Sequence, residues 1–93
     1  MSKSILQTEK ECYICGAVTG LECHHILAGT ANRRISEKYG LKVWLCHKHH
    51  TGAEGAQYDW TLNYQLKMDA QKKFEEIYSH ELWMKEIRKN YLF

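Results

Sequence analysis

Three cysteines and one histidine have the spacing of a zinc site. Cys12 and Cys15 enclose two residues, and Cys46 and His49 form a second pair of the same spacing later in the chain. Gly16, directly after the first pair, lets the backbone curl so that its amides face the sulfurs. Two such pairs supply the tetrahedral, sulfur-rich environment that Zn²⁺ prefers. The spacing therefore predicts a structural zinc with four ligands, Cys12, Cys15, Cys46 and His49.

Neighbouring histidines predict a second metal site, of the kind that hydrolyses phosphodiesters. His24 and His25 are adjacent, and His50 directly follows the zinc ligand His49. Because neighbours on a strand point to opposite faces, one of the adjacent pair can bind a metal while the other faces the substrate. A neutral imidazole then takes a proton from water, and a divalent cation stabilises the charge on the phosphate and the departing oxygen. The pattern places this cation on His24 and His50.

Short elements are expected to position these side chains. Residues 21–27 are bounded by glycines and are too short for a stable helix, which favours a strand. Residues 41–45 alternate well enough to form a second strand, which ends directly before Cys46. Cys46 and His49 share one face of a helical start, and residues 36–39 are expected to form a helical turn that a glycine ends.

The second half of the chain is expected to be helical. Apolar positions recur near helical spacing over residues 60–77, and Ser79 is expected to cap a second helix that extends to Tyr91. We expect the aromatic side chains of this half to pack as core against the metal-binding half. A surface for a protein partner is the alternative for the same aromatic residues.

Cys23 allows two interpretations. It is either a further metal ligand or a small core residue. Because it lies next to His24 in a strand with a buried face, we expect a core residue.

Composition favours a small, metal-stabilised protein of a reducing compartment. A domain of 93 residues buries too little apolar surface to be comfortably stable without a disulfide or a metal. Residues 1–12 lack the apolar core of a signal peptide, and no run of about 18 apolar residues suits a membrane span. We therefore expect a cytoplasmic protein without membrane contact, whose cysteines bind metal instead of forming disulfides.

The net charge of +2 excludes a strong nonspecific polycation. Any contact with nucleic acid must therefore come from a local basic cluster. Such a cluster is expected around the histidines, where it is suited to contact DNA phosphates, although an ordinary solvated face has the same composition. Its members are Arg33, Arg34, Lys38, Lys42 and Lys48.

Three segments resemble the HNH, or ββα-metal, endonuclease superfamily. They are Cys12-x-x-Cys15, Leu21-Glu22-Cys23-His24-His25-Ile26 and Leu45-Cys46-x-x-His49-His50, and they cover about half of the chain. Through residues 29–34, residues 36–41 and the helical tail, nearly the whole chain also resembles small phage and prophage proteins regarded as HNH-like.

The resemblance assigns a role to each histidine of the pattern. His25 becomes the general base, His24 the first ligand of a catalytic Mg²⁺, Mn²⁺ or Ni²⁺ in a place often held by aspartate, and His50 the second ligand. The asparagine that names the motif has no counterpart in residues 41–45, and Asn32 lies too early to replace it. A backbone carbonyl is the expected substitute for orienting His25.

The fold that the resemblance implies is a single α+β domain over residues 1–93. Residues 12–51 are expected to form a zinc-stabilised ββα-metal module of knuckle, two-stranded hairpin and helix. Two C-terminal helices are expected to follow it, in a helical support region at residues 56–93.

The expected function is metal-dependent hydrolysis of DNA by an HNH endonuclease encoded by a phage or prophage. DNA is the expected substrate. The protein is expected to act on it by itself, as a homodimer or together with a phage protein. The alternative is a catalytically silent zinc-binding module for DNA or protein contacts in phage assembly or packaging, which the missing asparagine favours. A zinc-finger transcription factor would need a basic recognition helix, and the sequence contains none that we can identify.

Overall fold

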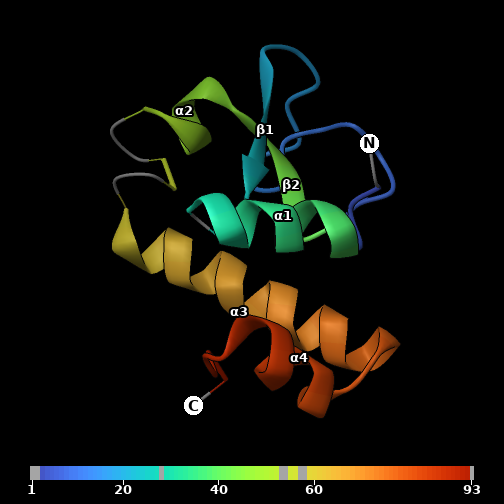
Figure 1. The fold of residues 1–93 in the computed structure, drawn as a ribbon. Coiled ribbons are helices and arrows are strands. Elements are labelled where there is room, and N and C mark those ends of the chain that lie inside the picture. Colours follow the sequence, from blue (N-terminus) through green and yellow to red (C-terminus); the bar gives the residue numbers. More distant parts are fainter. Residues whose placement is uncertain (1–2, 28, 53–54, 57–58, 93) are drawn as a thin grey trace.

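The computed structural model describes residues 3–27, 29–52, 55–56 and 59–92, and these residues form two strands and four helices. In Figure 1 the strands and the shortest helix lie on one side of α1, and the two C-terminal helices lie on the other. The protein is therefore α+β, as the sequence predicts. The elements in chain order are β1 (Leu21–His25), α1 (Thr30–Tyr39), β2 (Lys42–Cys46), α2 (His47–His50), α3 (Trp60–Ile77) and α4 (His80–Ile87).

The two strands form one antiparallel sheet with α1 as the connection between them. The register pairs Leu21 with Cys46 at one end of the sheet and His25 with Lys42 at the other. These two pairs are about 13 Å apart, because each residue of a strand adds about 3.3 Å. The sheet can therefore carry two separate sites, one at each end.

The helix between the strands is longer than the turn expected over residues 36–39. It starts at Thr30, and the Arg33 N–H donates to the Gly29 carbonyl at 2.8 Å. Gly40 ends it in the left-handed conformation, with φ of 71°. A Cβ at this position would also collide with the Lys3 carbonyl, so only glycine fits here. The extension adds six residues, between one and two helical turns, to the expected turn.

The last helix is capped at Ser79 as the sequence predicts, but it is shorter than expected. The Ser79 hydroxyl accepts the Leu82 N–H at 3.0 Å, which confirms Ser79 as the N-cap. The helix ends at Ile87, because Arg88 adopts φ of 64° and turns the chain back. Tyr91 therefore lies outside the helix, and its N–H donates to the Gln71 side chain at 2.7 Å.

Aromatic packing joins α1 to the two C-terminal helices. Phe74 and Trp83 are fully buried, and their rings lie 5.4 Å apart in an edge-to-face arrangement. Tyr39 of α1 contacts Phe74 in the same way at 5.1 Å. Trp60 departs from the expected core role, because 76% of its surface is exposed. The core therefore depends on the middle of α3 and not on its first turn.

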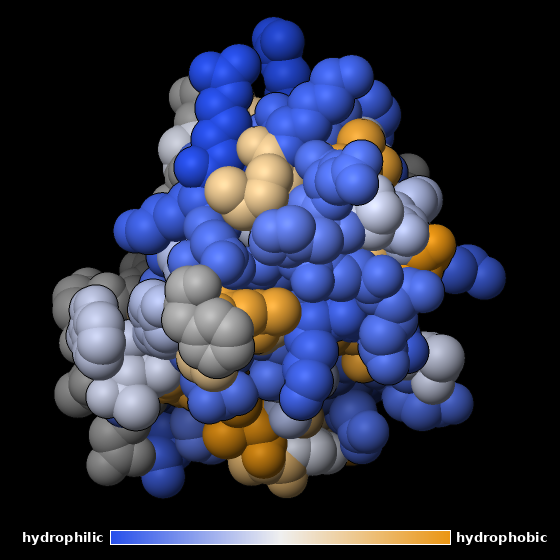
Figure 2. All heavy atoms as spheres, turned by 90° about the horizontal axis from the view of Figure 1, so that it is seen from below, coloured by the Kyte–Doolittle hydropathy of each residue, from blue (hydrophilic) through white to orange (hydrophobic). Residues whose placement is uncertain are grey.

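Seen from below relative to Figure 1, the surface is mostly hydrophilic, with separate small hydrophobic areas (Figure 2). Within the described part of the chain, no helix combines the length and the apolar character needed to cross a bilayer.

Truncation of Phe74 is expected to be strongly destabilising. Phe74→Ala leaves a cavity where three elements meet, and such core truncations cost about 3–5 kcal/mol. Trp60→Ala removes a larger aromatic ring from an exposed position and should change stability by about 0.5 kcal/mol or less. Urea denaturation followed by circular dichroism measures both. Equal losses in the two variants would contradict this assignment of the core.

Candidate functional site

The four residues with zinc spacing form one cluster at the end of the sheet where Cys46 pairs with Leu21. Their ligand atoms all lie within 4.8 Å of one another. Cys15 Sγ lies 3.8 Å from Cys46 Sγ, which in turn lies 3.2 Å from His49 Nδ1. Zinc–sulfur bonds of about 2.3 Å in tetrahedral geometry separate two sulfurs by about 3.8 Å. The cluster therefore has the composition and the dimensions that Zn²⁺ requires.

The local backbone holds the cluster together. Gly16, with φ of 79°, donates its N–H to the Cys12 carbonyl at 2.8 Å and so closes the knuckle. Tyr13 donates its N–H to the Trp44 carbonyl at 2.8 Å, which attaches the knuckle to β2. Cys46 ends β2 and His49 follows in α2, so one turn of chain delivers both remaining ligands.

The thiols of Cys12 and Cys15 differ in how readily they lose a proton. Burial raises the pKa of Cys12, but hydrogen bonds from the backbone amides of Cys15 and Cys46 outweigh it and lower the pKa to about 6. At Cys15 the Ala17 amide lowers the pKa, yet burial and the neighbouring sulfurs leave it raised. The lowered pKa of Cys12 favours metal binding, because a cation pairs with its thiolate, whereas at Cys15 a cation must displace the thiol proton.

His24 and His50, the residues expected to bind a catalytic cation, lie side by side. Their ring centroids are 5.2 Å apart in an edge-to-face arrangement. His24 is buried, and its Nε2 has no hydrogen-bond partner among the described residues. Burial, with a smaller contribution from His50, lowers the pKa of His24 to about 4, so the ring is neutral at pH 7. A neutral buried imidazole with an unpaired nitrogen is suited to bind a metal.

Glu22 supports this pair of rings. Its carboxylate lies 2.7 Å from His50 Nδ1, so the proton of the neutral ring belongs on Nδ1 and the lone pair on Nε2. Carboxylates hold metal-binding histidines in this way in many proteins. The hydrogen bond to His50, the largest contribution, lowers the pKa of Glu22 and keeps its carboxylate ionised.

His25 is held by a carboxylate and not by the backbone carbonyl expected from the sequence. Its Nε2 lies 2.8 Å from Glu37 Oε2, and the Lys42 ammonium donates to the same oxygen at 2.8 Å. Lys42 first, and then His25, lowers the pKa of Glu37 by hydrogen bonding, so the carboxylate is ionised. The His25 side chain is 17% exposed, which leaves the ring accessible to water.

The sequence contains no signal that would have identified Glu22 or Glu37 as partners of the histidines. Glu37 lies on α1 and reaches His25 across the interface between a helix and a strand. Glu22 lies on β1 and reaches His50 on α2. Both contacts depend on how separate elements pack, so residue spacing along the chain does not reveal them.

The structure corrects one member of the expected DNA-binding cluster. Lys42 is only 5% exposed and pairs with Glu37, so its ammonium is not available to a phosphate in the way that the sequence suggested. Arg33 and Arg34 are exposed on α1, and Lys48 is exposed on α2. Their contacts with DNA stay a prediction.

Cys23 lies outside the cluster of four ligands. It pairs with Trp44 in the sheet and is partly exposed. It is therefore not one of the clustered ligands, and it is less buried than the core residue expected from the sequence. Burial is the main cause of the raised pKa of its thiol. Its sulfur is therefore a weak nucleophile at neutral pH.

The sheet thus carries zinc-type ligands at one end and a carboxylate-supported histidine at the other. Cys46 belongs to the first group and His25 to the second. Neither the family models, nor the curated proteins, nor the solved structures that were compared contain a match to this chain.

Proposed function

We propose that the protein is a metal-dependent DNA endonuclease of the HNH type. In this proposal residues 12–51 form a zinc-stabilised ββα-metal module, and the substrate is DNA. One observation carries the proposal above all. The His24 Nε2 atom is buried without a described partner, directly beside the ring of His50, whose Nδ1 is already held by Glu22.

His24 and His50 would hold the catalytic cation. An unpaired buried nitrogen is costly unless something binds it, which supports a ligand at this position. When bound, a divalent cation stabilises negative charge on the phosphate and the departing oxygen. Imidazole ligands suit Ni²⁺ and Zn²⁺ better than Mg²⁺, so we expect the former to support activity at lower concentrations.

His25 would act as the general base. The Glu37 carboxylate lies at Nε2, so it holds the proton on that nitrogen and leaves the lone pair on Nδ1. Nδ1 is then the atom that accepts a proton from the attacking water. Lys42 keeps the carboxylate in place and ionised, and Glu37 in turn fixes the ring. Glu37 thereby takes the orienting role for which the motif has no asparagine.

A silent binding module is the second candidate. The observation that favours it is the exposed Trp60, whose ring stacks on Tyr64 at 5.4 Å between centroids. Exposed aromatic rings such as that of Trp60 occur at protein interfaces.

A plasmid-nicking assay distinguishes the two candidates. The zinc-loaded protein is incubated with supercoiled DNA and Mg²⁺, Mn²⁺, Ni²⁺ or added Zn²⁺, and the open circular form is measured. Conversion that requires an added cation supports the endonuclease. No conversion with any of the four cations would contradict the endonuclease and favour the binding module.

Loss of the Glu37 carboxylate is expected to slow nicking without removing the zinc. Glu37→Gln keeps the size of the side chain but removes the charge that orients His25, and loss of such supporting groups costs about 10–100-fold in rate. Glu37→Asp should recover part of the rate. Glu76→Gln, at an exposed position on α3, is the matched control. A single-turnover rate unchanged by Glu37→Gln would contradict the orienting role.

A further inference from the structure

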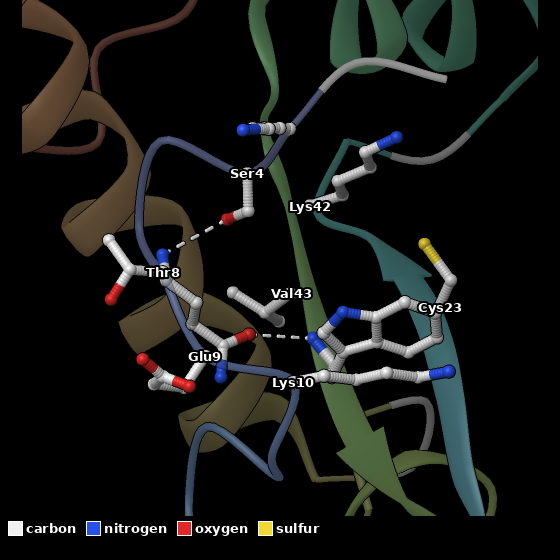
Figure 3. Close-up of a pocket in the computed structure, with 10 residues that line it drawn as sticks. Ser4, Thr8, Glu9, Lys10, Cys23, Lys42 and Val43 are labelled. Atoms are coloured by element: carbon white, nitrogen blue, oxygen red, sulfur yellow. Dashed lines mark hydrogen bonds between the residues drawn. The ribbon is translucent and has the colours of Figure 1, made fainter.

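A hollow of about 390 Å³ lies between β2 and the N-terminal segment, residues 3–10 (Figure 3). This volume is within the range of sites for small molecules, about 300–1,000 Å³. The side chains that matter for its chemistry are Lys3, Lys10, Cys23, Lys42 and Trp44. None of the roles assigned above uses this space.

The hollow adjoins the proposed general base. In the register Cys23 is opposite Trp44, and two residues further along the strand His25 is opposite Lys42. Alternate residues point to the same face of a sheet, so His25 lies on the face of Trp44, about 7 Å along the strand. Lys42 connects the two places, because it lines the hollow and donates to the carboxylate that holds His25.

The walls combine an aromatic ring with cations. The Lys10 ammonium lies over the Trp44 indole at 4.6 Å from the ring centroid. The described lining contains a single acidic side chain, Glu9, and because Lys42 pairs with Glu37, its available cations are Lys3 and Lys10, whose charge favours an anionic ligand. An aromatic surface next to lysines is the combination that binds single-stranded nucleic acid, in which bases stack and phosphates pair with cations.

We propose that this hollow binds the base of an unpaired nucleotide, next to the phosphate that is cut. The base takes the place of the exposed Lys10 side chain over the indole, and the released ammonium pairs with the neighbouring phosphate. Bases in a duplex are stacked on one another, so the ligand must be single-stranded or extruded from the helix. The position relative to the cut phosphate rests on the proposed function, whereas binding of the base does not.

Fluorescence anisotropy with a short labelled single strand tests this proposal. The His25→Ala protein is used because it binds without cutting. Adding Trp44→Ala is expected to weaken binding by about tenfold or more, because stacking on an aromatic ring contributes that much per base. Ile77→Ala, which shortens an exposed hydrophobic side chain of α3 outside the hollow, is the control and should bind as before. Zinc content and thermal unfolding are measured for each variant.

A surface substitution keeps the test valid if Trp44→Ala does not fold. Lys10→Gln leaves the sheet intact and should reduce the dependence of log Kd on log salt by about 0.7, as expected for one lost phosphate contact with a single strand. Lys72→Gln, exposed on α3, should leave the salt dependence unchanged. A duplex of the same sequence should bind more weakly than the single strand.

The outcomes separate this proposal from the endonuclease proposal. Nicking by the wild type, together with equal affinity of the Trp44→Ala and Ile77→Ala proteins for the single strand, would overturn the base-binding site and leave the nuclease in place. Binding that depends on Trp44 without any nicking would support the site and contradict the nuclease. Equal affinity for duplex and single strand would also count against an unpaired base as the ligand.

Discussion

Cys46→Ser is expected to release the zinc and to unfold residues 12–51 at room temperature. Cys46 lies within 4 Å of two other ligands and connects β2 to α2, so its loss disrupts the cluster at its centre. Structural zinc contributes about 10–16 kcal/mol, whereas a small domain has only about 5–15 kcal/mol of net stability. The chain cannot compensate for a loss of that size with its core alone.

The fourth cysteine provides a matched control for this experiment. Cys23→Ser makes the same chemical change in the same sheet, at a sulfur outside the cluster. We expect this variant to keep one zinc per chain and a cooperative thermal transition. Metal content by mass spectrometry and melting by circular dichroism, both under reducing conditions, measure the difference. A Cys46→Ser protein that melts like Cys23→Ser would contradict a structural zinc.

His25→Ala is expected to reduce the nicking rate by about 10²–10⁴-fold, the usual contribution of a general base. The substitution removes the nitrogen that accepts the proton but leaves His24 and His50 in place. Because His25 lies at the opposite end of the sheet from Cys46, zinc content and the melting temperature should change little. This variant therefore distinguishes a loss of catalysis from a loss of folding.

His80→Ala is the control for loss of an imidazole. His80 starts α4, is exposed and pairs with Glu75 at 2.6 Å, far along the chain from the proposed site. Its nicking rate should equal that of the wild type. Single-turnover rates with excess protein avoid differences in product release. Equal rates for His25→Ala and the wild type would remove His25 from the mechanism even if the protein is a nuclease.

Local patterns in the sequence were sufficient for the metal cluster and for most element positions. Each ligand pair is separated by two residues, so one turn of backbone brings both members together wherever the pair lies in the fold. The cap at Ser79 is equally local, because its hydroxyl binds an amide three residues away. Patterns of this kind depend only on the backbone geometry of a few consecutive residues, so they can be recognised in the sequence itself.

Contacts between elements could not be obtained in this way. The carboxylates that hold His25 and His50 come from other elements, and Lys42 is buried because α1 supplies Glu37 beside it. Trp60 has the helical spacing of a core residue, yet nothing in the described structure covers it enough to bury it. Spacing shows which residues share a face of one element, but burial and partners depend on what packs against that face. The cluster of four metal-type ligands therefore follows from the sequence, whereas the support of the histidines and the hollow beside them follow only from the tertiary structure.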